Sequence, residues 1–327
     1  MTVHTHILFG GPARSPSDLQ RSMLASARLR LAVAAAAAQE LDQKFSLGEQ
    51  CPQQSDRLIV GKIGTDDIQN RQRLWLSEIE RLRGMGARVI LDYTDHHLIN
   101  NSPLTPFYRT ACEMVDVICV PTNSLRFALT EQCGIQCKIE VIPDLLEYEI
   151  VKPKAASIGK NPVGMWFGHF TNAKFLAKFI DSHHRELSGH ELNIVSTPQT
   201  LEVLKRYPFS TPPKISVTAF QWSVQAVARV AEVTDYCIIP SHTDSPKRHA
   251  SNNRLITALT LGLPTLATAL PSYVEFSDYF LHIGSSEDKD LLRQLPTLKH
   301  NIEAFQQLHV ARFQSPELIR QWRLLLE

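Results

Sequence analysis

Ile238-Ile-Pro-Ser-His-Thr-Asp-Ser-Pro-Lys-Arg-His-Ala-Ser-Asn-Asn-Arg254 runs directly into Leu-Ile-Thr-Ala-Leu-Thr-Leu-Gly262-Leu-Pro264. A buried strand is expected to end at Pro240, and after a polar loop an apolar helix runs to Gly262. The loop gathers cationic side chains within eight positions: Lys247, Arg248, His249 and Arg254. Fixed cations beside the free N–H groups of a helix start suit a diphosphate. We therefore expect a strand–loop–helix unit with an anion site; a mobile surface loop with scattered charges is the alternative.

The same alternation of short apolar runs and helical patterns extends along all 327 residues and predicts parallel sheets covered by helices. In the first half we expect strands at His6–Gly10, Arg57–Lys62, Arg88–Asp92, Val115–Pro121 and Ile139–Pro143. In the second half we expect them at Val163–Phe167, Glu191–Ser196, Lys214–Phe220, Tyr236–Pro240, Thr265–Ala267 and His282–Ile283. The turn-rich stretch 150–162 between the halves is predicted to be a linker.

The predicted fold class is therefore α/β, with two Rossmann-like, doubly wound parallel-sheet domains. We place the first domain at 1–150 and the second at 151–314, followed by a helix at 315–327. Ligands of doubly wound sheets bind beyond the carboxyl ends of the strands. With two such domains, the cleft between them is the expected site, so the residues that follow strands are the candidates.

Composition limits the classes of partner. The formal net charge is +1, so no global charge directs the chain to nucleic acid or to an anionic membrane. The alanine run Ala34–Ala38 is much shorter than a membrane span, and we expect no transmembrane segment. The six cysteines show no zinc-site spacing and indicate reduced thiols in a cytoplasmic protein.

A second candidate loop opens the C-terminal half. Gly168 follows a predicted strand and lets the backbone approach a ligand, and His169 comes next. Asn172 can cap the following helix, whose free N–H groups favour a phosphate, and Lys174 adds a cation. An ordinary strand–turn–helix junction with a solvated lysine is the equally weighted alternative.

A third candidate, Asp92-Tyr-Thr-Asp95-His96-His97, follows a strand of the N-terminal half. Asp92, Asp95 or His96 could orient an acceptor hydroxyl or take its proton. A structural polar cluster and, less favoured, a metal site are the alternatives.

Three further places follow strands. Gly10 and Gly11, with Arg14 nearby, allow a substrate to approach the backbone, or form a tight turn. Trp222 stands where a base could rest, or packs at a helix start. Glu275 could meet a ribose or sugar, or be a solvated glutamate.

The ordered set of strand, polar loop, helix and Leu261-Gly-Leu-Pro-Thr-Leu-Ala-Thr268 resembles the donor site of glycosyltransferases with the GT-B fold, of the group 1 or family 4 type. The Gly168-x5-Lys174 spacing resembles that group's Gly-Arg-x4-Lys loop, with His169 in place of the arginine. The resemblance covers most of the chain and is clearest from about 163 to 275. It implies metal-independent transfer of a sugar from a nucleotide diphosphate, a substrate rather than a cofactor, to an acceptor hydroxyl.

In this resemblance the donor side comprises Gly168, His169, Asn172, Lys174, Trp222, Lys247, Arg248, His249, Asn253, Arg254 and Glu275. The acceptor, a glycan, a lipid-linked molecule or a protein, would bind the first domain, and a lipid acceptor would bring the protein to the inner face of a membrane. The final helix would cross back to the first domain, as is common in this fold.

The sequence departs from the group at two positions. The retaining members carry two glutamates eight positions apart, which align here with His249 and Thr257. Two alternatives to a transferase follow: a non-catalytic subunit that binds a nucleotide sugar or glycan, and a nucleotide-sugar epimerase on the same fold.

Overall fold

The computed structural model describes residues 2–64, 66–99, 102–153, 161–244, 246–284 and 291–327, without the side chains of residues 246, 247 and 291. The chain forms two compact units. Unit 1 contains the chain up to Leu146, together with His249–Ser251 and Arg312–Glu327. Unit 2 contains Glu147–Arg248 and Asn252–Ala311. Most of the predicted linker, at 154–160, lies outside the described residues.

Unit 1 is built on a six-stranded sheet in the order β2-β1-β3-β4-β5-β6. All of its neighbouring strands are parallel. The strands are β1 (His4–Leu8), β2 (Lys44–Gly48), β3 (Arg57–Val60), β4 (Arg88–Asp92), β5 (Val117–Val120) and β6 (Lys138–Val141). The helices are α1 (Pro16–Gln20), η1 (Ala27–Leu31), α2 (Ala32–Glu40), α3 (Ile68–Gly84), α4 (Thr105–Met114), α5 (Asn123–Phe127) and η2 (Ala128–Gln132).

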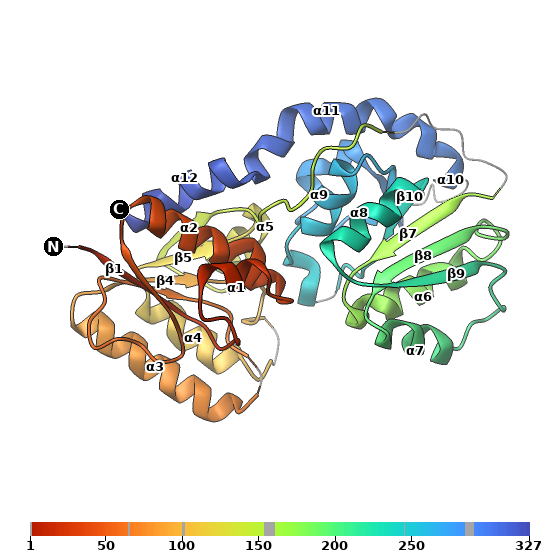
Figure 1. The fold of residues 1–327 in the computed structure, drawn as a ribbon. Coiled ribbons are helices and arrows are strands. Elements are labelled where there is room, and N and C mark those ends of the chain that lie inside the picture. Colours follow the sequence, from red (N-terminus) through yellow and green to blue (C-terminus); the bar gives the residue numbers. More distant parts are fainter. Residues whose placement is uncertain (1, 65, 100–101, 154–160, 245, 285–290) are drawn as a thin grey trace. The chain divides into compact units, whose positions relative to one another are not determined.

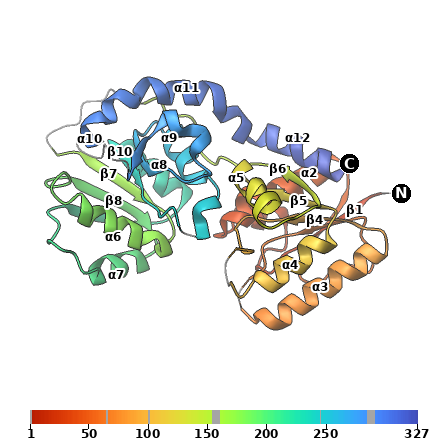
Figure 2. The ribbon, with the colours of Figure 1, turned by 180° about the vertical axis from the view of Figure 1, so that it is seen from behind.

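The strands of unit 1 are apolar on both faces because each face has its own core. Ile7, Ile59 and Ile90 face a core formed with the alanines of α2, which allow close packing of helix on sheet. The adjacent residues, such as Leu8 and Leu91, face a second core formed with α3 and α4. Figures 1 and 2 show α3 and α4 together on one side of this sheet.

Unit 2 repeats the design with a parallel sheet in the order β12-β11-β10-β7-β8-β9. Its strands are β7 (Val163–Phe167), β8 (Glu191–Ser196), β9 (Ser216–Gln221), β10 (Tyr236–Ile239), β11 (Thr265–Thr268) and β12 (Leu281–Ile283). The α-helices are α6 (Ala173–Ser182), α7 (Gln199–Arg206), α8 (Val224–Glu232), α9 (Asn253–Thr260), α10 (Leu291–Gln294) and α11 (Lys299–His309). The 3-10 helices are η3 (Phe170–Asn172), η4 (Pro246–His249), η5 (Val274–Tyr279), η6 (Leu295–Leu298) and η7 (Val310–Phe313), the last at the border of the two units. Two doubly wound parallel sheets confirm the predicted fold class.

The last helix, α12 (Ser315–Leu326), belongs to unit 1 and packs on α2. Trp322 and Leu326 of this helix are buried in the same core as the α2 alanines. The side chains of Gln43 and Arg57 donate hydrogen bonds to the carbonyl oxygen of Leu326 at 3.1 and 2.9 Å. Of the described helices, none has the length and apolar character needed to cross a bilayer.

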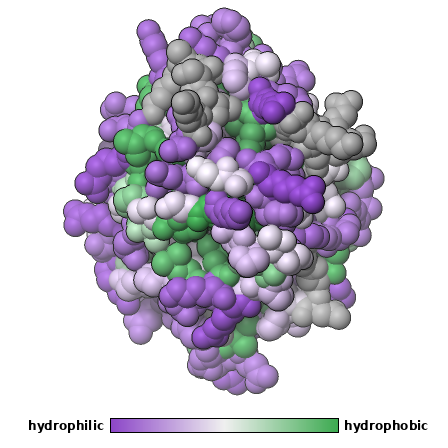
Figure 3. Space-filling model, turned by 90° about the vertical axis from the view of Figure 1, so that its right-hand side faces the viewer, coloured by the Kyte–Doolittle hydropathy of each residue, from purple (hydrophilic) through white to green (hydrophobic). Residues whose placement is uncertain are grey.

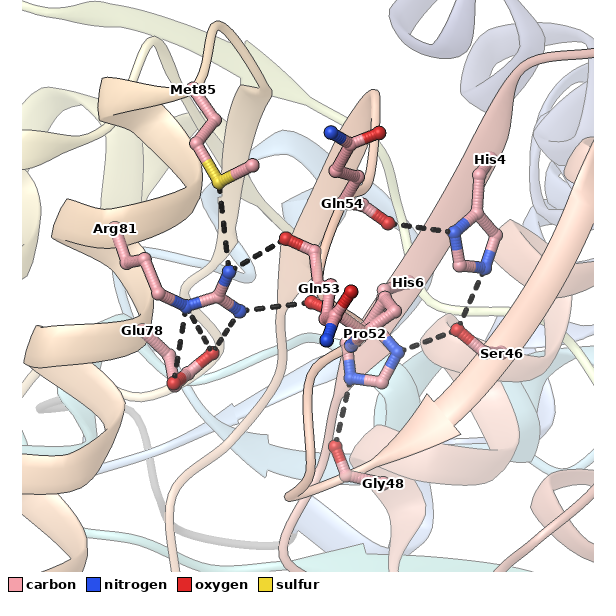
Figure 4. A network of polar contacts seen from close by, with 10 residues as sticks. All are labelled: His4, His6, Ser46, Gly48, Pro52, Gln53, Gln54, Glu78, Arg81 and Met85. Carbon is pink, nitrogen blue, oxygen red and sulfur yellow. Dashed lines mark hydrogen bonds and ion pairs between the residues drawn. The ribbon is translucent and has the colours of Figure 1, made fainter.

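Strand β2 was not predicted from the sequence. Its residues, Lys44-Phe-Ser-Leu-Gly48, lie at the edge of the sheet and are mostly half-exposed, so they form no continuous apolar run. A chain of polar contacts joins it to β1 (Figure 4). The Ser46 hydroxyl lies 2.7 Å from His6 Nδ1 and 2.9 Å from His4 Nε2, and His6 Nε2 bonds the Gly48 carbonyl at 3.1 Å. Burial lowers the pKa of His6 to about 4, so this ring is neutral near pH 7.

Candidate functional site

The topology predicts where each unit would bind a ligand. In unit 2 the chain first builds β7, β8 and β9 in one direction and then β10 and β11 in the other, so the strand order reverses between β7 and β10. In unit 1 the reversal lies between β1 and β3. Doubly wound sheets bind ligands outside the carboxyl ends of the strands at such a switch point.

Gly168 lies at the switch point of unit 2, directly after β7. Its φ angle is +154°, which L side chains rarely adopt. Its carbonyl oxygen accepts a hydrogen bond of 2.6 Å from the Ser196 hydroxyl, which also lies 2.6 Å from the Thr200 hydroxyl. The end of β8 therefore fixes the backbone of the predicted phosphate loop.

Arg254, near the start of α9, reaches this glycine. Its Nη1 atom lies 3.3 Å from the position that a Cβ atom would take at Gly168. The half-buried guanidinium forms a hydrogen bond with Tyr273. Burial raises the pKa of Tyr273, and the contact with Arg254 partly opposes that rise. Nη1 itself is buried and has no hydrogen-bond partner among the described residues. A buried, charged N–H group without an acceptor is costly, which indicates that an acceptor belongs here.

Two other buried donors accompany Arg254. The Trp166 indole nitrogen and the Ser272 hydroxyl are both buried without a hydrogen-bond partner in the described part of the chain. Trp166 lies in β7, and its ring is 3.5 Å from the Cβ position at Gly168. Ser272 follows β11, the neighbour of β10. The carboxyl edge of this sheet therefore offers unsatisfied donors, which suits an anion.

The loop after β10 is anchored to β11. The Thr268 hydroxyl accepts a hydrogen bond from the Ser241 amide at 2.9 Å and contacts the Ser241 carbonyl at 3.3 Å. The sequence did not single out four residues of this edge as candidates: Trp166, Ser196, Thr268 and Tyr273. Ser196 and Thr268 end strands β8 and β11, and that position was the available signal.

Three other predicted donor residues lie in the segment that follows β7, with differing local roles. His169 is exposed, and its Nδ1 accepts a hydrogen bond from the Thr171 amide at 3.4 Å. Lys174 is exposed in the first turn of α6, with its ammonium 5.0 Å from the centre of the Phe175 ring. Asn172 precedes α6, and its amide donates to the His169 carbonyl at 2.9 Å.

The remaining predicted donor residues follow other strands. Trp222 is half-buried directly after β9, and its amide donates to the Ser196 carbonyl at 3.0 Å. Glu275 is exposed in η5. Arg248 is half-buried in η4, and Asn253 begins α9. The side chain of Lys247 lies outside the described residues.

The Gly262-Leu-Pro264 turn has a structural role that the geometry explains. Gly262 has φ of +72°, and a Cβ atom there would come within 2.5 Å of the Val151 carbonyl oxygen. The Val151 amide donates to the Thr260 carbonyl at 2.9 Å. Gln306 of α11 donates to the carbonyl oxygens of Val151 and Leu259, at 2.8 and 3.0 Å. The turn therefore lets the incoming chain dock on the last residues of α9.

In unit 1, the glycines after β1 lie at the switch point. A Cβ atom at Gly10 would come within 3.2 Å of the Glu49 carboxylate and 3.4 Å of Arg71. Arg71 bonds Glu49 at 2.6 Å. Arg14 donates to the carbonyl oxygen of Gly11 at 3.0 Å, so it stabilises its own loop. The Arg71–Glu49 pair, from residues 22 positions apart, was not predicted.

Asp92, predicted to act in catalysis, is fully buried at the end of β4. Its Oδ1 atom accepts a hydrogen bond of 2.7 Å from Arg30 Nε. Arg30 also donates to the Ile142 carbonyl at 2.6 Å and to Asp144 at 3.1 Å. Burial raises the pKa of Asp92, and the Arg30 charge opposes that shift. The geometry gives Asp92 a structural ion pair, and sequence analysis missed its partner Arg30 within an apolar helix.

The rest of the loop after β4 is more polar and more exposed. Asp95 forms an ion pair with Lys62, which follows β3, and both side chains are more than one-third exposed. His96 is buried, edge to face with the His249 ring at 5.5 Å between centroids. His249 belongs to unit 1, and its Nδ1 lies 2.6 Å from the Ser124 hydroxyl.

Next to this pair, burial lowers the pKa of His97 to about 4, and its ring stacks on Tyr108. A metal site was the least favoured alternative for this loop. In the described part of the chain, no three His, Cys, Asp or Glu residues gather in a way that could hold a metal ion.

Comparisons with known proteins agree with this arrangement at the level of the fold. No known family's sequence profile matches the chain, and no curated protein matches it in sequence. Among solved structures, HepE from Anabaena, solved in complex with UDP and glucose, has a TM-score of 0.65 at 13% identity and covers 99% of both chains.

This chain has the GT-B fold.

Other similar structures share the fold over parts of their length. Sucrose-phosphate synthase from Thermosynechococcus elongatus has a TM-score of 0.59 at 13% identity, over 98% of this chain and 81% of that protein. The pneumococcal O-GlcNAc transferase GtfA, in complex with UDP and GlcNAc, has a TM-score of 0.51 at 14% identity. The match covers 83% of this chain but only 56% of the length of GtfA.

Proposed function

We propose that this GT-B protein is a glycosyltransferase that transfers a sugar from a nucleoside diphosphate donor to an acceptor hydroxyl. The observation that carries the proposal is the buried Nη1 atom of Arg254, which lacks an acceptor beside the Gly168 loop. A diphosphate oxygen would supply that acceptor. Two proteins of similar fold were solved with UDP and a sugar, which supports this class of ligand.

The chemistry follows from where charge develops. Negative charge grows on the diphosphate as its bond to the sugar breaks, so cations and N–H donors held in place beforehand favour the transition state. Arg254 is well suited because a hydrogen bond to Tyr273 already holds its half-buried guanidinium, whereas Lys174 is exposed and adds a flexible charge. Arg248, Asn253 and the first N–H groups of α9 stand on the same loop.

We assign the acceptor side to the carboxyl edge of the sheet in unit 1. Asp95 is the carboxylate proposed to orient the acceptor hydroxyl, because it is partly exposed and paired with Lys62. Asp92 is an unsuitable base, since its side chain is completely buried against Arg30.

Binding is tested by thermal shift and calorimetry with UDP, GDP, ADP and their glucose conjugates. One nucleotide should raise the melting temperature, because a ligand of the native state stabilises it. Arg254→Met keeps the length of the side chain but removes about 1.5–3 kcal/mol of charged hydrogen bonding, which weakens binding about 10- to 150-fold. Lys178→Met removes an exposed cation from α6 and serves as the control. Unchanged affinity in Arg254→Met would refute the proposed donor site.

A specific observation favours a second function, a non-catalytic nucleotide-sugar-binding subunit. The two positions that align with the glutamates of retaining enzymes hold His249, bonded to Ser124, and the buried Thr257. Release of free nucleoside diphosphate from the bound donor, lost in Arg254→Met, supports the transferase. Tight binding without any turnover supports the subunit, and an isomerised nucleotide sugar would indicate an epimerase.

A further inference from the structure

The strand β9 forms an unusually open edge of the sheet in unit 2. It is the last strand in the order, and among the described residues it pairs with β8 alone. All six of its residues are exposed, including Val217 at 42% and Phe220 at 37%. Figure 1 shows β9 at the outer edge of its sheet, and Figure 3, which views the molecule from the right-hand side of Figure 1, shows apolar residues reaching the surface among polar ones.

The other three sheet edges carry features that prevent pairing with another strand. Strand β2 has five residues, begins with Lys44 and ends with a glycine. Strand β6 places Lys138 and Glu140 on its edge, joined by an ion pair of 2.8 Å. Strand β12 has only three residues. Charged side chains and short length are usual protections of an edge strand, and β9 is an uncharged strand of six residues.

The orientation of the β9 backbone determines which of its N–H and C=O groups face away from β8 and can bind another strand. The amides of Ser216 and Trp222 donate to carbonyl oxygens of the β8 segment, at 3.1 and 3.0 Å. Successive residues of a parallel strand direct their backbone N–H and C=O groups to opposite sides. The residues between those bonded to β8, which are Val217, Ala219 and Gln221, therefore direct these groups to the open edge. These three residues offer an uninterrupted row of donors and acceptors.

We propose that β9 is a dimerisation strand, which pairs antiparallel with β9 of a second copy of this chain about a two-fold axis at Ala219. This register places Ala219 opposite itself and Val217 opposite Gln221 of the second copy. All the outward-facing groups are then paired, in about six hydrogen bonds. Thr218 and Phe220 form the close, non-hydrogen-bonded pairs, which suit an aromatic next to a β-branched residue.

The charge pattern of this edge is compatible with pairing of two identical copies. No charged residue occurs from Ile215 to Ala228, although 20% of the whole chain is charged. In the proposed register Lys214 lies opposite Val224, so no like charges meet when two identical edges pair. The two-fold axis pairs the β9 edge of one copy with the β9 edge of the other. No β9 edge is then left for a third copy, so the assembly closes at two copies.

The size of the strand predicts a weak dimer. A six-residue strand pair buries less than the roughly 1,200 Å² at the lower end of stable specific interfaces, so we expect a weak dimer that forms only at high protein concentration. Sedimentation velocity and light scattering on the full chain, from about 1 to 200 μM, should show a monomer converting to a dimer. A monomer at every concentration, or growth beyond a dimer, would overturn the proposal.

Two substitutions at Ala219 locate the interface. Ala219→Lys brings two like charges together at the axis, and Ala219→Pro removes an outward N–H group while leaving the β8 ladder intact. Each should weaken dimerisation at least tenfold with little change in the melting temperature of the monomer. Val233→Lys, at a 64% exposed apolar position elsewhere in unit 2, should leave the dimer unchanged. Dimerisation that survives both Ala219 substitutions would place the interface elsewhere and refute the proposal.

Discussion

Replacing Arg30 by methionine tests how unit 1 holds a charged pair inside its core. Arg30 is 1% exposed and Asp92 is completely buried, with 2.7 Å between Nε and Oδ1. The substitution leaves the Asp92 carboxylate and the Ile142 carbonyl without their donor. Removal of one partner of a buried ion pair costs about 3–5 kcal/mol, so the free energy of unfolding should fall by that amount.

The assay is urea denaturation of Arg30→Met, Asp92→Leu and the double variant, at pH 7 and pH 5. The double variant should be more stable than the sum of the single losses predicts, because it leaves no uncompensated charge on either residue. The penalty of Arg30→Met should shrink at pH 5, because the pKa of Asp92, already raised by burial, rises further without the arginine. A loss below about 1 kcal/mol, or strict additivity in the cycle, would show that this pair is not what stabilises the ends of β4 and β6.

Three further predictions concern other contacts. The folded-state pKa of His6, about 4, lies below its ordinary 6.5, so its contribution is complete above pH 6.5 and decreases as the pH falls toward 4. Urea denaturation should show a loss of about 2 kcal/mol at pH 5 that His6→Gln largely removes; equal pH dependence in both proteins would contradict the shift. Gly168→Ala should lower the free energy of unfolding by about 1–2 kcal/mol and weaken nucleotide binding. Gly84→Ala, at a position with no neighbour within 4 Å, should do neither. If the two variants had the same melting temperature and the same nucleotide affinity, backbone strain at Gly168 would be contradicted. Gln306→Ala should lower the free energy of unfolding by about 1–3 kcal/mol, since buried carbonyls lose their donor, and a neutral result would mean that water replaces it.

The sequence was sufficient for the fold because its strands are covered on both faces. A continuous apolar run such as Leu58-Ile-Val can be recognised as a buried strand from its own residues. The edge strand β2, exposed on one side, has no comparable pattern. Arg254 was predicted because four cationic residues stand close together in one loop. Its contact with Tyr273, which depends on β11 lying beside β10, was beyond the reach of a sequence pattern.

For Asp92, in contrast, position in the sequence suggested a role that does not fit the burial of its side chain. A carboxylate at the end of a strand is a reasonable catalytic candidate from its position alone. Its partner Arg30 is 62 residues away, in a turn of π-helix that precedes the alanine-rich α2. Only the packing of that helix on the sheet decides that the carboxylate is buried.

The docking of Val151 on the end of α9 has a mechanical consequence. The eight residues of this helix, about 12 Å long, separate the junction made by Gly262 and Gln306 from Arg254 at the opposite end. A helix this short transmits displacement as a stiff rod. A displacement of the chain at Val151 would therefore be passed along α9 to Arg254 near its other end.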